Sequence, residues 1–93
     1  MAKELTARDV QWGRGRARAY IRAWGLPRRL AEDVVAVCLL GLAEAARSFL
    51  PRRGATFKQS ARRRMEEALR EFLTAEGEYA RRHVPLARVR GRM

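Results

Sequence analysis

The sequence predicts an all-α protein, a small bundle of three to four helices around one core. Apolar residues recur at helical spacing in three long segments, and glycine or proline ends each segment. No stretch alternates apolar and polar residues as a half-buried strand does. A chain of 93 residues suits one domain of this kind. Residues 1–93 are therefore expected to form a single unit, with a basic C-terminal end from about residue 84.

The first predicted helix runs from about Ala7 to Trp24. Thr6 and Asp9 can cap its start, and Gly25 is a typical stop signal. Arginines recur every fourth residue along one flank, at positions 14, 18 and 22. The predicted inward face comprises Val10, Gly13, Ala17, Tyr20, Ile21 and Trp24.

The second predicted helix, from about Pro27 to Phe49, carries apolar residues on two faces. The predicted inward stripe comprises Leu30, Val34, Val37, Cys38, Gly41 and Ala45. The other face carries Val35, Ala36, Leu39, Leu40 and Ala43. A helix that is apolar all round is either central in its fold or covered by something else. Burial within this chain and docking of a partner protein both remain open.

A basic turn, Pro51-Arg52-Arg53-Gly54, separates the second helix from the third. Thr56 and Gln59 form a predicted capping box for a helix from about Phe57 to Ala75. Gly77 interrupts this segment, and a short basic helix is expected around Tyr79 to His83. The predicted buried stripe comprises Phe57, Ala61, Met65, Ala68 and Phe72.

The charge of the chain indicates a polyanionic partner. Twenty-one basic side chains against ten acidic ones give a net charge of +11. The arginines are spread around the predicted fold, which favours nucleic acid over a membrane surface. No apolar run approaches the roughly 20 residues that span a bilayer. The lone cysteine, Cys38, allows no internal disulfide and is expected to be a buried packing residue in a cytoplasmic, nucleoid-associated protein.

The sequence contains no recognisable catalytic or cofactor site. His83 is the single histidine, and Ser48 and Ser60 have no neighbouring base. We expect a binding protein, with neither metal nor cofactor, rather than an enzyme. Acidic residues of the third helix (Glu66, Glu67 and Glu71) are expected to pair with its arginines. Arg62 and Arg63 are candidates for phosphate contacts or for a purely solvated role, and Arg64 for a brace to Glu67 or Glu71.

The order of residues over about forty positions resembles the second conserved region of bacterial sigma factors. Asp33 opens an apolar helix, and Gly41-Leu42, Ala45 and Phe49 follow at the offsets of that family. Leu50-Pro51-Arg52-Arg53-Gly54 resembles its turn, and Ala55 to Ala61 resembles the start of its next helix. Arg63-Arg64-Met65 is most similar to the flagellar and sporulation types.

The resemblance implies two partners. In the family, the aspartate-led helix docks on the clamp helices of the RNA polymerase beta-prime subunit, and the next helix engages and melts the promoter minus-ten element. It implies polymerase contacts by Glu32, Asp33, Ala36, Val37, Leu39, Leu40 and Ala43. It implies DNA contacts by Arg52, Arg53, Lys58, Gln59, Arg62 and Arg63. No region for the minus-thirty-five element is present, so a second protein could supply it.

The sequence also departs from the family. Gln59-Ser60 replaces its Thr-Tyr, which removes an aromatic face on which a displaced base could stack. Ala36, Val37 and Leu39 replace its usual Gln, Glu and Asn. Two alternatives to a sigma-like factor remain: a polymerase-binding regulator that does not open DNA, and a general basic nucleic-acid-binding helical domain.

Overall fold

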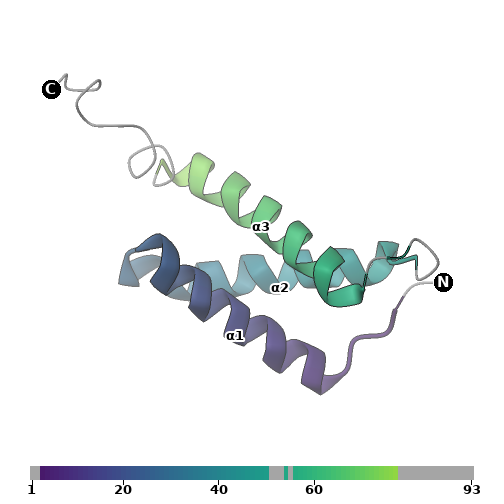
Figure 1. The fold of residues 1–93 in the computed structure, drawn as a ribbon. Coiled ribbons are helices and arrows are strands. Elements are labelled where there is room, and N and C mark those ends of the chain that lie inside the picture. The colour runs from purple at the N-terminus through teal and green to yellow at the C-terminus, as the bar shows by residue number, and fades with distance from the viewer. Residues whose placement is uncertain (1–2, 51–53, 55, 78–93) are drawn as a thin grey trace, which may run out of the picture.

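The computed structural model describes residues 3–50, 54 and 56–77 and confirms the all-α class. Three α-helices, α1 (Ala7–Trp24), α2 (Ala31–Ser48) and α3 (Phe57–Glu76), are joined with one 3-10 turn, η1 (Arg28–Leu30). The helix predicted around residues 79–83 and the basic end from residue 84 lie outside the described residues. Figure 1 shows α2 running in the opposite direction to α1 and α3, with α1 below it and α3 above it in this view.

The core lies where α2 meets the other two helices. Val34, Cys38 and Leu42 of α2 are fully buried, as are Met65 and Leu69 of α3. Burial of each such side chain stabilises the fold by roughly 1.5–3 kcal/mol. Cys38 is the packing residue that the sequence predicts, and desolvation by burial raises the pKa of its thiol to about 11.

Capping boxes fix the starts of α1 and α3, as predicted. The Thr6 hydroxyl accepts from the Asp9 backbone N–H at 3.1 Å, and the Asp9 carboxylate accepts from the Thr6 N–H at 2.9 Å. That backbone hydrogen bond is the main cause that lowers the pKa of Asp9. Thr56 and Gln59 repeat the arrangement at α3. Gly25 and Gly77 end these helices with positive φ, a conformation that glycine adopts without strain.

The predicted start of the second helix at Pro27 is wrong by four residues. Pro27 has an extended backbone, with ψ 148°, and so stands before the helical turns. Residues 28–30 form the 3-10 turn η1, in which the Leu30 N–H donates to the Pro27 carbonyl at 3.0 Å. The α-helix begins at Ala31 and ends at Ser48, because Phe49 is again extended.

The inward faces of α2 and α3 are rotated from those predicted. In α2, Leu42 is fully buried, whereas Val37 is only half-buried. In α3, Leu69 and Leu73 are fully buried, whereas the predicted Phe57, Ala68 and Phe72 are half-buried. The cause for α2 is its contact with α1, since a Cβ built on Gly13 would lie 2.9 Å from Leu42 Cδ2.

The backbones of α2 and α3 approach each other closely at Gly41. A Cβ at this position would lie 2.9 Å from Met65 Cα and 3.1 Å from the Arg64 carbonyl oxygen. Only hydrogen at this position allows such an approach of two backbones. The absence of a side chain at Gly41 therefore sets the spacing of the α2–α3 pair.

Candidate protein-docking and nucleic-acid interfaces

One face of α2 is not covered by the described residues. We call it the outer face and define it by the seven predicted docking residues: Glu32, Asp33, Ala36, Val37, Leu39, Leu40 and Ala43. None of the seven is buried. Leu40 is 55% exposed, the highest exposure of any large hydrophobic side chain among the described residues. Of the two readings of this helix, the described structure supports an uncovered apolar face.

Leu39 belongs to the outer face only in part. Its side chain is half-buried and packs against the core, and a Cβ on Gly13 would lie 3.1 Å from its Cδ2. A charged substitution at Leu39 would therefore disturb the contact between α1 and α2. The freely accessible apolar members are Ala36 and Leu40, four residues apart on one stripe.

Two shallow grooves flank this stripe. The groove between α1 and α2 is lined by Arg14, Arg18, Ile21, Ala31, Glu32, Val35, Ala36 and Leu39. The groove between α2 and α3 is lined by Val37, Leu40, Glu44, Arg64, Glu67, Ala68, Glu71 and Phe72. Each has an apolar part bordered by charged side chains, as protein interfaces commonly have. The outer face and its two grooves together form one candidate docking surface.

The predicted DNA-binding residues of α3 are exposed but do not share one direction. Lys58 is directed to α1, with its Nζ 5.5 Å from the centre of the Trp12 ring. The Gln59 side chain is engaged in the capping box. Arg62 and Arg63 are both exposed. The remaining two predicted residues, Arg52 and Arg53, lie outside the described residues.

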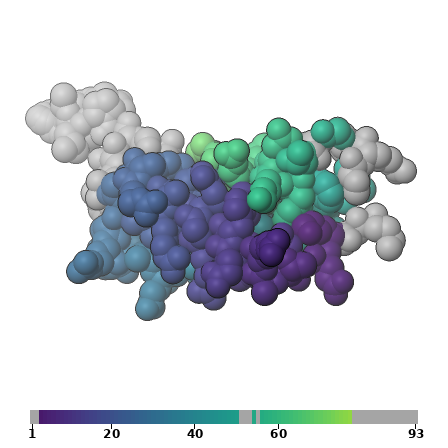
Figure 2. All heavy atoms as spheres, turned by 60° about the horizontal axis from the view of Figure 1, so that its bottom comes forward, coloured from purple at the N-terminus to yellow at the C-terminus, as the bar shows by residue number. Residues whose placement is uncertain are grey.

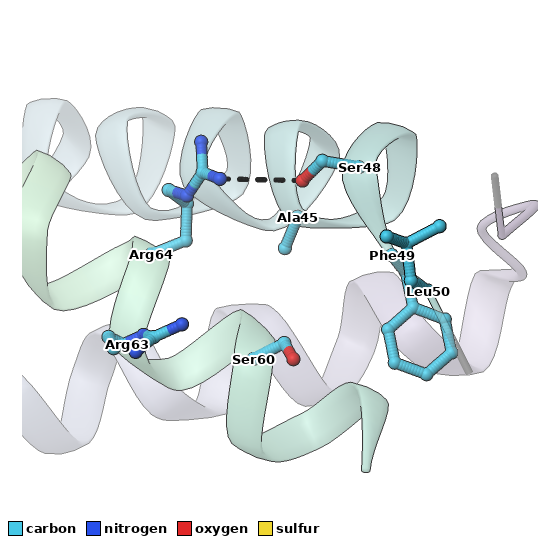
Figure 3. Close-up of a pocket in the computed structure, with 7 residues that line it drawn as sticks. All are labelled: Ala45, Ser48, Phe49, Leu50, Ser60, Arg63 and Arg64. Carbon is cyan, nitrogen blue, oxygen red and sulfur yellow. Dashed lines mark hydrogen bonds between the residues drawn. The ribbon is translucent and has the colours of Figure 1, made fainter. Parts of the chain in front are cut away.

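A pocket lies between the end of α2 and the beginning of α3. Its lining comprises Ala45, Ser48, Phe49, Leu50, Ser60, Arg63 and Arg64. Figure 3 shows the arginines on the α3 side of this space and Ser48 on the α2 side. Phe49 packs edge-on against Phe57, with ring centres 5.5 Å apart. The pocket thus brings Arg63 beside a second arginine and two hydroxyl groups.

The predicted brace from Arg64 to Glu67 or Glu71 is wrong. The Arg64 guanidinium instead reaches α2, where it donates to the Ser48 hydroxyl at 3.4 Å and lies 4.0 Å from the Glu44 carboxylate (Figure 3). Side chains from two helices can meet in this way only after the helices pack, so spacing within α3 did not indicate it. Arg64 is a link between helices. A predicted pair within α3, Glu66 with Arg70, is present at 3.7 Å.

Sequence reasoning missed two side chains of α1, one of which contacts α3. Trp12 contacts Lys58, and Arg16 lies over the Tyr20 ring, 5.0 Å from its centre. The available signal was their spacing, because Trp12, Arg16, Tyr20 and Trp24 recur every fourth residue and so share one side of a helix.

The described helices include none with the length and apolar content to cross a membrane. In the same part of the chain, no three His, Cys, Asp or Glu side chains are grouped as potential metal ligands. Comparison with family models, curated proteins and solved structures finds no match to this chain. The outer face of α2 and the exposed basic side chains of α3 are therefore the two candidate interfaces.

Proposed function

We propose that this protein is a sigma-like transcription factor. It docks through the outer face of α2 on the beta-prime clamp helices of bacterial RNA polymerase and engages promoter minus-ten DNA through α3. The proposal combines the resemblance around Asp33, Gly41 and Phe57 with two separate surfaces, one apolar and one basic.

The observation that carries this proposal is the exposure of Leu40. Leu40 is 55% exposed at the centre of the outer face, although fully buried Leu42 is only two positions away. Docking would remove this side chain and the neighbouring grooves from water. Burial of apolar surface contributes roughly 25 cal/mol of favourable free energy for each Å² buried. Charged groove borders, including Arg14 and Glu67, favour a partner surface with charges of both signs.

The basic side chains of α3 support the second half of the proposal. Lys58, Arg62 and Arg63 are exposed on α3, in a chain with a net charge of +11. Contacts from such side chains to phosphates position a protein on DNA without reading its sequence. Promoter selectivity would then depend on the deformability of the minus-ten DNA and on the polymerase.

Leu40→Glu is expected to weaken binding to core RNA polymerase by at least about tenfold, which corresponds to 1.4 kcal/mol. The substitution places a charge in an apolar contact but disturbs no buried residue. Binding is measured by pull-down and by a fluorescence titration with purified core enzyme. Ala7→Glu is the matched control, because it adds the same charge at an exposed position of α1. Wild-type protein that does not bind core enzyme at micromolar concentration rules out the polymerase proposal.

Replacing Arg62 and Arg63 together with alanine is expected to remove about two phosphate contacts. Each lost contact reduces the magnitude of the slope of log K against log salt by about 0.9. The measurement is a titration of duplex promoter DNA at several salt concentrations. The control changes Arg28 and Arg29 to alanine, which removes the same charge from η1. Equal slopes for the two double variants would show that Arg62 and Arg63 make no specific contribution.

A polymerase-binding regulator is the second candidate, and Ser60 favours it. Ser60 is half-buried beside Arg63 and Arg64, where sigma factors carry a tyrosine on which a base can stack. A fluorescent base in the minus-ten element distinguishes the two candidates. Its signal rises on promoter opening, whereas a regulator binds polymerase and leaves the signal unchanged.

A further inference from the structure

The contacts between α1 and α3 follow a single register. Trp12 contacts Lys58, the Tyr20 hydroxyl donates to the Glu66 carboxylate at 3.1 Å, and Arg70 lies over the Trp24 ring at 5.8 Å. Each contact joins residues 46 positions apart, so the two helices run in parallel with rows of every fourth residue facing each other. We call these two rows the α1–α3 seam. Its members are Trp12, Arg16, Tyr20 and Trp24 on α1 and Lys58, Arg62, Glu66 and Arg70 on α3.

The same register places Arg62 opposite Arg16. Both residues fall in the one position of the seam between the Trp12–Lys58 contact and the Tyr20–Glu66 contact. Arg16 is half-buried and Arg62 is exposed. The two arginines thus occupy facing positions of the seam, and an anion bound between these positions would be attracted by both positive charges.

The seam has too little negative charge of its own. Its only carboxylate, Glu66, already accepts from Tyr20 and pairs with Arg70. Neither Arg16 nor Arg62 forms an ion pair with any described residue. In addition, Nε of Arg16 is buried without a hydrogen-bond partner among the described residues. Buried polar atoms normally have a partner, so the Arg16 Nε–H is an unused hydrogen-bond donor at this position of the seam.

Tyr20 does not add negative charge to offset the excess of positive charge in the seam. Burial is the largest cause that raises the pKa of its phenol; the neighbouring Arg16 side chain acts in the opposite direction, and the Glu66 carboxylate raises the pKa further. The tyrosine therefore stays neutral at physiological pH, and its O–H donates a hydrogen bond to the Glu66 carboxylate. Both carboxylate oxygens of Glu66 are thus engaged, one by Tyr20 and the other by Arg70.

We infer that the α1–α3 seam contains a phosphate-binding site formed by Arg16 and Arg62, with Lys58 beside it. Guanidinium groups suit this ligand because their planar N–H donors match phosphate oxygens in pairs. The inference depends on the proposed function only for the source of the phosphate, which would be a nucleic-acid strand. This site differs from the pocket of Figure 3, which involves Arg63 and Arg64 on another side of α3. Figure 2 looks onto α1, with α3 along its upper edge.

The test observes the Arg16 Nε–H directly by NMR in the full chain labelled with nitrogen-15. A buried N–H exchanges slowly with water and gives a resolved signal, which the Arg16→Lys variant identifies by its loss. The protein is titrated separately with inorganic phosphate and with an oligothymidine single strand. We expect a saturable shift of this signal. Tighter saturation by the oligonucleotide identifies a strand as the source of the phosphate, and tighter saturation by inorganic phosphate identifies a free anion.

Two neighbouring arginines provide the matched comparison. Arg62→Gln is expected to weaken the effect on the Arg16 signal by about tenfold, the loss of one charge-assisted contact. Arg63→Gln, equally exposed but outside the seam, should leave it within about twofold. An Arg16 signal that does not respond to either ligand, or responds equally in both variants, overturns the inference.

The outcomes also separate this inference from the proposed function. If duplex DNA and polymerase bind while the Arg16 signal is unchanged, the seam site is wrong and the proposed function stands. If the signal saturates while core polymerase does not bind, the seam site stands and the polymerase proposal is wrong.

Discussion

Gly41→Ala should destabilise the protein by about 2 kcal/mol, although alanine is the better helix former by roughly 1 kcal/mol. The new methyl carbon would lie 2.9 Å from Met65 Cα and 3.1 Å from the Arg64 carbonyl oxygen. Both atoms belong to the backbone of α3, so no flexible side chain can move aside. The two helices must separate, and the core between them loses contacts. Urea unfolding followed by circular dichroism measures the change.

Gly15→Ala is the matched control for this prediction. Gly15 lies in the middle of α1, is exposed, and has no other atom within 4 Å of a built Cβ. The same substitution should therefore raise stability by about 0.5–1 kcal/mol through helix propensity alone. Opposite signs at the two glycines are the expected result. A stabilising Gly41→Ala would contradict the close approach of α2 and α3.

Leu42→Ala should lower the free energy of unfolding by about 3 kcal/mol, within the 2–5 kcal/mol that buried leucines typically lose. Leu42 is fully buried and faces Gly13 of α1, so truncation leaves a cavity where α1 and α2 meet. For a domain of this size, such a loss lowers the melting temperature by more than about 10 °C. Differential scanning calorimetry measures it.

The comparison for Leu42 is Leu40→Ala, in the same helix and of the same chemistry. Leu40 is 55% exposed, so its truncation should cost about 1 kcal/mol or less. The same variant should bind core polymerase more weakly if the outer face is the docking surface. Similar losses of stability at both leucines would mean that the outer face is covered in solution.

Helix ends could be predicted wherever a side chain marks them. The bounds of α1 are those predicted, and α3 extends one residue further, because capping boxes and glycines act within a few residues of each helix end. Pro27 was ambiguous, since proline suits both the first turn of a helix and the extended residue before it. In the structure its backbone is extended, and the preceding Leu26 is buried in the core.

The rotation of each helix could not be predicted, because it depends on where its neighbours lie. Apolar residues of α3 cover more than one side, and both Phe72 and Leu73 were plausible core positions. The packing of α3 against α2 buries Leu73 fully in the core and leaves Phe72 half-buried. Similarly, Arg64 could have paired within its own helix, and only the packing of α3 against α2 brings it to Ser48. The facing of Arg16 and Arg62 also required the register between two helices that are not consecutive.

The single thiol, Cys38, allows the opening of the protein interior to be measured by chemical labelling. Thiol reagents attack the thiolate, and burial both shields Cys38 and raises its pKa to about 11. A labelling reagent therefore reacts only during the moments when the interior is open. The rate of labelling at neutral pH therefore reports how often the interior opens. Any variant, free or bound to a partner, can be compared in this way without introducing a dye or a second cysteine.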